Sequence, residues 1–427
     1  MSMNEEDVYP NLDGLSAKEM GVLEGKRRAG TEPCFIFETM GVNYREKARV
    51  ELVIQFMLDN QGLNGDEDYC LLPNTKSLHS SHSCFVSFAA SPLHASLSFN
   101  FYASSCPTAE LIVSNMVRSA SSSDPTIPGK LLRLLFHDCF VEGCDASVLL
   151  QGNGTERSDP ANTSLGGFSV IDSAKSVLEI FCPKTVSCAD IVALAARDAV
   201  VTVKSLILIF IFLCHICLQM QSSVEGLNIV VVFEQAGGPA FEMPTGRRDG
   251  RISNAANVRS NIVDTSFTMI EMIRLFNSKG LSLDDLVTLS GAHTIGVAHC
   301  NAFSDRFQMD SKGNLTLIDT SLDKAYAKEL MKKCPSGSSA SKTVNNDPET
   351  SFAFDNQYYI NLLGHKGLFQ SDSVLVEDER TSARVEAFAN DQETFFRSWR
   401  DSFLKLTTIG VKTDDEGEIR QSCSFAN

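Results

Sequence analysis

Cysteines constrain the fold of this chain more than any other feature. The 427 residues include 13 of them, a high number for a protein from a reducing compartment. Four stand beside Pro or Gly in turn-like contexts, at Cys106, Cys144, Cys182 and Cys334. This pattern predicts a fold held together by disulfides and formed in an oxidising compartment, with at least one cysteine left unpaired because the total is odd.

The charge balance limits the kinds of partner. The chain carries 37 basic and 53 acidic residues, which gives a net charge of -16. Nucleic acid and anionic membrane surfaces attract basic proteins, so we expect neither as a partner. Three N-x-[ST] sequons, at Asn153, Asn162 and Asn314, are compatible with a secreted glycoprotein.

Helical periodicity dominates from about residue 100 onward. The stretch "SCADIVALAARDAVV" opens with Ser187 as an N-cap candidate and Asp190 three positions later, the arrangement of a capping box. The stretch "TSFTMIEMIRLFNSKG" has helical spacing and a stop signal at Gly280. Because strand signals are few, the sequence predicts an all-α fold. Residues 1–96 show no clear periodicity.

The most apolar run, "KSLILIFIFLCHICLQM", covers Lys204 to Met220. Its uninterrupted apolar part, Leu206 to Leu218, is only about 13 residues long and includes His215, whereas a membrane span needs roughly 20. We therefore expect no stable membrane insertion.

The stretch "LLRLLFHDCFVEGCDASVLL" is rich in groups that carry chemistry. Arg133 and His137 are four residues apart and share one face of a helix. A cation beside an imidazole lowers its pKa and keeps it neutral, ready to act as a base. Asp138 adjoins His137 and points to another face, so these two do not form a catalytic dyad.

Oxygen-bearing residues follow in the same stretch. Asp138, Asp145 and Ser147, with the carbonyls of Val141 and Gly143, suit a hard cation such as Ca²⁺. The alternative is a helix with a surface histidine and a solvated acidic turn. The density of features favours the functional interpretation.

A second histidine, His293, lies among small residues that would let a flat, bulky group approach the backbone. Much later, Asp372 is a carboxylate in an otherwise apolar setting. Such a carboxylate can accept the second ring N–H of a metal-bound imidazole. The sequence alone does not show that these two residues meet.

Six ordered motifs carry a family resemblance: "RLLFHDCFVEGCDASVLL", "CPKTVSCADIVALAARDAVV", "MPTGRRDGR", "DLVTLSGAHTIGVAHC", "FDNQYY" and "KGLFQSDSVL". Together they resemble the secreted plant haem peroxidases of class III, over about 97–201 and 236–427. The resemblance implies two helical domains that sandwich one haem b, with minor β structure. It also implies a monomer that reduces H2O2 and oxidises phenolic donors in one-electron steps, in cell-wall chemistry and the response to oxidative stress.

The resemblance assigns roles to particular residues. On the distal side of the haem, His137 matches the acid–base histidine, Arg133 the arginine, Phe136 the aromatic residue and Asn162 the partner of the histidine. On the proximal side, His293 matches the iron ligand and Asp372 its carboxylate partner. Val263 stands where a substrate-contacting proline is expected.

Two Ca²⁺ sites and four disulfides are implied in the same way. The first calcium site is made of Asp138, Val141, Gly143, Asp145 and Ser147, and the second of Thr294, Asp347, Thr350, Ala353 and Asp355. The disulfides join Cys106 to Cys182, Cys139 to Cys144, Cys188 to Cys423, and Cys300 to Cys334. The remaining five cysteines are Cys34, Cys70, Cys84, Cys214 and Cys217.

All five lie in segments that the family pattern lacks, namely residues 1–96 and an insert at about 202–235. We interpret 97–427 as the haem peroxidase domain interrupted by that insert, and 1–96 as a disordered segment or a gene-model artefact with the remnant of a signal region near 84–96. The insert has features of a retained or mispredicted intron. Extracellular location is expected if the true transcript encodes a signal peptide. The competing hypothesis is a non-catalytic haem- and calcium-binding glycoprotein whose site the insert compromises.

Overall fold

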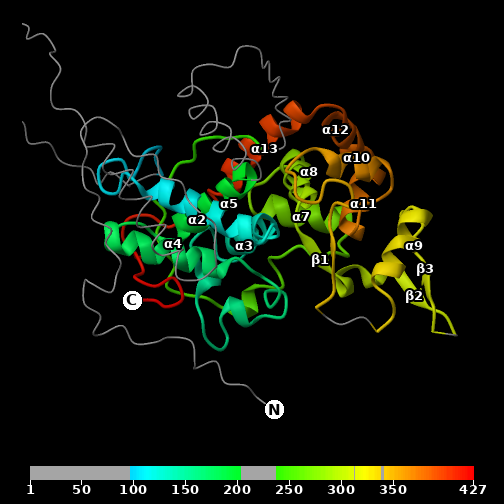
Figure 1. Cartoon of the computed structure of the whole chain (residues 1–427), viewed down its shortest axis with the longest axis horizontal. Helices are drawn as coiled ribbons and strands as arrows, with labels where there is room; N and C mark the ends of the chain where they lie inside the picture. The colour runs from blue at the N-terminus through cyan, green and yellow to red at the C-terminus, as the bar shows by residue number, and fades with distance from the viewer. Residues whose placement is uncertain (1–96, 203–236, 312, 338–340) are drawn as a thin grey trace, which may run out of the picture. The chain divides into compact units, whose positions relative to one another are not determined.

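The computed structural model describes residues 97–202, 237–311, 313–337 and 341–427 (Figure 1). The predictions for residues 1–96 and for the insert, including the apolar run, fall outside these described residues apart from Thr202. The same holds for the five surplus cysteines.

Helices make up most of the described chain, which confirms the all-α prediction. The α-helices are α2 (Ala109–Ser123), α3 (Ile127–Val141), α4 (Phe168–Phe181), α5 (Cys188–Thr202), α7 (Met269–Ser278), α8 (Leu283–Ser290), α9 (Lys324–Lys333), α10 (Gln357–Leu363), α11 (Gln370–Glu377), α12 (Glu379–Asn390) and α13 (Gln392–Leu406). Short 3-10 helices are η1 (Ser147–Leu149), η2 (Glu156–Ser158), η3 (Ala255–Asn257), η4 (Gly291–Thr294) and η5 (Cys300–Arg306).

Within the described ranges, the β-strands form two small antiparallel pairs. Strand β1 (Val297–His299) pairs with β4 (Thr343–Asn345), with Ala298 opposite Val344. Strand β2 (Phe307–Met309) pairs with β3 (Leu315–Leu317), with Gln308 opposite Thr316. Each strand has three residues, which fits the few strand signals in the sequence.

Helix α5 is central to the first group of helices, where it packs against α2, α3 and α4 (Figure 1). Its start is capped as predicted on one side, because the Ser187 hydroxyl accepts a hydrogen bond from the Asp190 N–H at 3.1 Å. The second hydrogen bond of the predicted capping box, from the Ser187 N–H to the Asp190 carboxylate, is wrong. The Asp190 carboxylate instead accepts hydrogen bonds from the Tyr102 hydroxyl at 2.6 Å and from Arg247 at 2.7 Å.

The second group of helices comprises α8 and α10 to α13. Its core is aromatic: the ring of Phe354 lies 5.7 Å from that of Phe395 and 4.7 Å from that of Trp399. Helix α7 begins at the capping box of Thr268 with Glu271, and the predicted stop signal, Gly280 at φ +75°, follows its end. A smaller separate core gathers buried residues from β1, η5, α9 and β4 with Leu368 and Phe369.

The two groups meet where α3 contacts η4. Gly129, near the start of α3, lies so close to Gly296 that a Cβ on Gly129 would be 2.5 Å from the Gly296 Cα. Gly296 also has φ +95°, in the region that favours glycine. This close approach fixes the histidine-bearing segments on α3 and η4 relative to each other.

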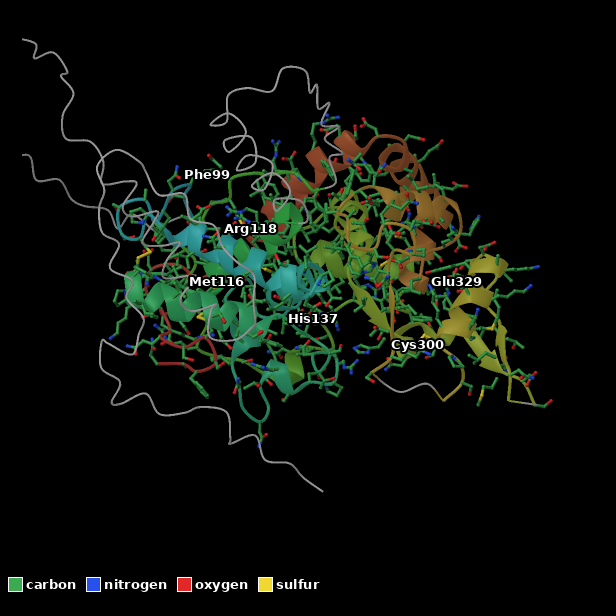
Figure 2. The ribbon with its side chains drawn as sticks, viewed as in Figure 1. Phe99, Met116, Arg118, His137, Cys300 and Glu329 are labelled. Atoms are coloured by element: carbon green, nitrogen blue, oxygen red, sulfur yellow. A yellow bond between two sulfur atoms is a disulfide. The ribbon has the colours of Figure 1, made fainter. Side chains whose placement is uncertain are left out.

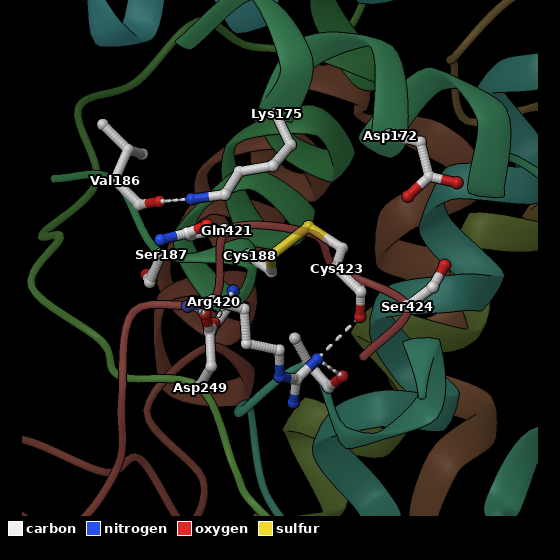
Figure 3. Close-up of a disulfide and its surroundings, with 12 residues drawn as sticks. Asp172, Lys175, Val186, Ser187, Cys188, Asp249, Arg420, Gln421, Cys423 and Ser424 are labelled. Carbon is white, nitrogen blue, oxygen red and sulfur yellow. Dashed lines mark hydrogen bonds between the residues drawn. A yellow bond between two sulfur atoms is a disulfide. The ribbon is translucent and has the colours of Figure 1, made fainter. Parts of the chain in front are cut away.

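Four disulfides form among the described residues, and their pairing is the one that the family resemblance implies: Cys106–Cys182, Cys139–Cys144, Cys188–Cys423 and Cys300–Cys334. Figure 3 shows Cys188–Cys423, which ties the start of α5 to the C-terminal segment. Beside it, the buried Arg420 guanidinium donates to the carbonyl oxygens of Ala146, Cys423 and Gly250. The C-terminal segment is therefore locked to the first group by both a covalent bond and hydrogen bonds.

The capping box at α7 predicts a measurable loss of stability in a Thr268→Ala variant. Without the hydroxyl, the Glu271 N–H loses its acceptor, which costs about 1 kcal/mol of unfolding free energy. Urea unfolding should show a lower midpoint with an unchanged slope. Thr268→Ser keeps the hydroxyl and should stay near the parent, so equal losses in both variants would contradict the capping role.

Candidate active site

Arg133 and His137 face each other on α3, as their spacing predicts. The Arg133 Nε donates to the His137 Nε2 at 3.2 Å. The remaining guanidinium nitrogens donate to the Ser164 hydroxyl at 2.9 Å and to the Ala161 carbonyl at 3.1 Å. These contacts hold the guanidinium beside the imidazole, whose place in the first group of helices is seen in Figure 2.

The other ring nitrogen of His137 contacts Asn162. Its Nδ1 lies 2.7 Å from the Asn162 Oδ1, and the Asn162 Nδ2 donates to the Glu156 carbonyl at 2.8 Å. Because an amide oxygen only accepts, Nδ1 carries the proton, and the lone pair is on Nε2, where it accepts the hydrogen bond from Arg133. Asn162 is buried, so its sequon is not open to glycosylation in this fold.

The environment of His137 keeps its imidazole neutral. Burial, followed by the positive charge of Arg133, lowers the pKa of His137 to about 3, while the hydrogen bond with Asn162 acts in the opposite direction. The Phe136 ring lies edge-on to the imidazole, with centroids 5.6 Å apart. Val263, the expected substrate contact, is half-buried against the same core.

The second histidine meets its expected carboxylate. The Nδ1 of His293, in η4, lies 2.8 Å from the Oδ1 of Asp372, in α11. The ring is flanked by Tyr358 and Phe369, at centroid distances of 5.9 and 5.2 Å. Since Nδ1 is engaged by Asp372, Nε2 is the ring nitrogen that remains for a metal.

Asp372 is buried and accepts two further hydrogen bonds. The Tyr358 hydroxyl donates to Oδ1 at 2.9 Å, and the Phe369 N–H donates to Oδ2 at 3.0 Å. Burial alone would raise the pKa of Asp372, but the electrostatic interaction with His293 and the three hydrogen bonds outweigh it and hold the pKa below its ordinary value. Asp372 is therefore a carboxylate anion.

Sequence reasoning gave no role to Tyr358, although it lies in the quoted motif "FDNQYY". Burial, followed by the charge of Asp372, raises the pKa of Tyr358 well above its ordinary value, so its hydroxyl keeps its proton and acts as a donor. The signal in the sequence was two adjacent tyrosines in a helix, and it does not reveal which of the two faces Asp372.

The first predicted calcium cluster is buried. Asp138 accepts hydrogen bonds from the N–H groups of Ala146 and Val148, and the buried Ser147 hydroxyl has no hydrogen-bond partner among the described residues. Burial, then the charges of Asp145 and of nearby Glu156, raises the pKa of Asp138 well above its ordinary value.

A divalent cation beside these groups would favour their charged forms and give the Ser147 oxygen a partner. Asp145 also forms an ion pair with Lys412, which a cation would have to share or displace. The carbonyls of Val141 and Gly143 come from the end of α3 and the turn after it.

The second predicted cluster gathers beside η4. The Thr294 hydroxyl donates to the Asp355 Oδ1 at 2.9 Å, and the Thr350 hydroxyl lies 3.1 Å from the same oxygen. Asp347 is buried and lies 3.4 Å from Thr350 through its Oδ2, and Ala353 follows in the same loop.

Among the described residues, no place brings together three or more His, Cys, Asp or Glu side chains suited to a metal. Each calcium cluster instead combines two Asp side chains with hydroxyl and carbonyl oxygens. Such mixed oxygen donors are the ligands that Ca²⁺ takes in proteins.

No helix in the described part of the chain is both long and apolar enough to cross a membrane.

Comparison with known proteins identifies the family. A family model described as "Peroxidase" matches residues 113–391. The chain is 62% identical to Peroxidase 46 of Arabidopsis thaliana over 333 residues, and this match covers 78% of this chain and 92% of the relative. It is 61% identical over 334 residues to Peroxidase 18 of the same plant, with 78% and 92% covered, and 42% identical over 340 residues to Peroxidase 66, with 79% and 94% covered. The chain therefore belongs to the plant haem peroxidases of class III, and it is a peroxidase.

Proposed function

We propose that this peroxidase holds its haem between His137 and His293 and reduces H2O2 to water at the expense of phenolic donors. The observation that carries the proposal is the way in which both histidine rings are held. Each has its Nδ1 engaged, by Asn162 or by Asp372, so each presents Nε2. The haem, when bound, supplies the redox chemistry, and the protein positions and tunes it.

His137 is the acid–base residue in this proposal. Its Nε2 would accept a proton from one oxygen of H2O2 and return it to the other oxygen, which leaves as water. Two phenolic donors would each give one electron and one proton, which convert the remaining oxygen to a second water. A base of this kind must be neutral beforehand, and the low pKa of His137 ensures this. The Arg133 guanidinium stabilises the negative charge that develops as the O–O bond breaks.

His293 is the iron ligand in this proposal. The anionic Asp372 accepts its Nδ1–H and makes the imidazole a stronger electron donor. A stronger donor favours the more oxidised states of iron over the ferrous state.

We further propose two Ca²⁺ ions at the clusters described above. The second would brace His293, because Thr294 follows it directly in η4 and binds Asp355. The first would brace α3 next to His137 through Asp138.

The remaining parts of the proposal rest on family resemblance. The protein is a monomeric, secreted glycoprotein that acts on cell-wall phenolics and in oxidative stress, with Val263 near the reducing substrate. These parts also include a peroxidase domain at 97–427 that is interrupted at about 202–235.

Replacing His137 by Ala should slow the reaction with H2O2 by about 10²–10⁴-fold, because general acid–base transfer typically contributes that factor. Haem loading should persist, since the proposed ligand is His293. Stopped-flow absorbance of the haem-loaded enzyme measures the rate. The exposed His365, at φ +55°, offers a control in His365→Asn, which should react like the parent. An unchanged rate in His137→Ala would remove His137 from the mechanism.

The charge of Arg133 should be visible in the pH dependence. The neutral base is lost as the pH falls through the pKa of His137, and removing a nearby cation raises that pKa. In Arg133→Leu, the acid-side loss of the peroxide rate should therefore move to higher pH than in the parent. Arg157→Leu is the control, because it also removes a guanidinium, but one that packs on the Phe168 ring at 3.8 Å from the centroid. Identical acid midpoints for Arg133→Leu and the parent would refute the charge effect.

Calcium should stabilise the fold through Asp347. Burial raises the pKa of Asp347, and the charge of Asp355 adds to this, so a cation that binds both carboxylates favours the folded state. The melting temperature of the parent should rise with Ca²⁺. At a free Ca²⁺ concentration of 100 times the dissociation constant, binding adds about 2.7 kcal/mol to the unfolding free energy. Asp347→Asn should reduce this response, whereas the exposed Asp401→Asn should keep it. A parent without any Ca²⁺ response, after chelation and dialysis, would overturn both sites.

A further inference from the structure

We propose that Tyr358 is a positioning residue for the proximal histidine, which it tunes through Asp372. Its hydroxyl donates to the same carboxylate oxygen that accepts the His293 N–H, and so it limits how strongly Asp372 polarises the imidazole. The inference rests on the proposed function in one respect, that His293 is the iron ligand.

The contacts come from separate elements and converge on one buried carboxylate. Tyr358 belongs to α10, Asp372 to α11 and His293 to η4. The Oδ1 of Asp372 lies 2.9 Å from the Tyr358 hydroxyl and 2.8 Å from the His293 Nδ1. Tyr358 is 4% exposed and Asp372 2%. Bulk water therefore does not replace the phenol easily, and the two donors share one oxygen.

Because two donors share the Asp372 Oδ1, each affects the strength of the other's hydrogen bond. A carboxylate oxygen that already accepts a phenol proton carries less free charge for a second donor, and its hydrogen bond to the imidazole is weaker than it would be alone. Without the phenol, Asp372 draws more strongly on the His293 N–H, which gives the ring more imidazolate character. An imidazolate-like ligand donates more electron density and stabilises ferric over ferrous iron.

The neighbouring tyrosine provides a matched control. Tyr359 is also buried, and it lies one residue further along α10. Its hydroxyl lies 2.9 Å from the Val287 carbonyl and 3.1 Å from the Thr288 carbonyl, and so it anchors α10 to α8. The same Tyr→Phe change at 359 removes a buried hydroxyl of equal size without touching Asp372.

The test compares Tyr358→Phe and Tyr359→Phe in the haem-loaded, full-length enzyme. We expect the ferric/ferrous reduction potential of Tyr358→Phe to become more negative, and the iron–histidine stretching band of the ferrous form to move to higher frequency in resonance Raman spectra. Tyr359→Phe should move neither. An unmoved potential and band in Tyr358→Phe, or equal shifts in both variants, would overturn the inference.

A second replacement reverses the expected sign and preserves the shape of the side chain. Site-specific 3,5-difluorotyrosine at position 358 is a more acidic phenol and a stronger donor, so the potential should become more positive. This decides the question even if Tyr358→Phe loses haem; a negative shift or no shift counts against Tyr358.

Failure of the proposed function gives a different result. If the parent lacks the iron–histidine band, or if His293→Ala keeps it, then His293 is not the ligand and the inference fails with the proposal. If the parent shows the band, His293→Ala loses it and both replacements at 358 leave it unmoved, then only the role of Tyr358 is overturned.

Discussion

The contact between Gly129 and Gly296 is the constraint on which the rest of the site depends. It joins the start of α3 to Gly296, two residues after the end of η4, at a distance that no side chain on Gly129 would allow. His137 comes eight residues after Gly129, which is about 12 Å along the helix axis. His293 comes three residues before Gly296. One tight backbone contact thus sets the positions of both histidines, while α3 carries His137 away from the point of contact.

The two histidines show how neighbours give one residue type two roles. His137 has a cation at one ring nitrogen and a neutral amide at the other, so burial and Arg133 keep it uncharged. His293 has an anion, Asp372, which is itself held by donors from two further residues. The first environment suits a group that takes up a proton and releases it. The second suits a ligand that pushes electron density toward a metal.

Much of this arrangement was predictable from local sequence, and the rest depends on contacts that only the fold creates. The Arg133–His137 pair follows from helical spacing, and the Thr268 cap from its neighbours. The second half of the Asp190 capping box failed because Tyr102 and Arg247, 88 and 57 residues away, take its carboxylate. Tyr358 was missed for the same reason, since Asp372 lies 14 residues further along the chain. The disulfide pairing needed the family pattern, because cysteine spacing alone allows many pairings.

The junction at the end of α5 bears on how the peroxidase core is connected. The Gly238 N–H donates to the Val200 carbonyl at 3.0 Å, so the chain on the two sides of 203–236 meets through a backbone hydrogen bond. A side chain at 238 would collide with Val200 and with the buried ring of Phe354, which makes the contact specific for glycine. The core of the second group thereby packs directly against the last turn of α5. In the described fold, the residues that flank this junction therefore contact each other directly.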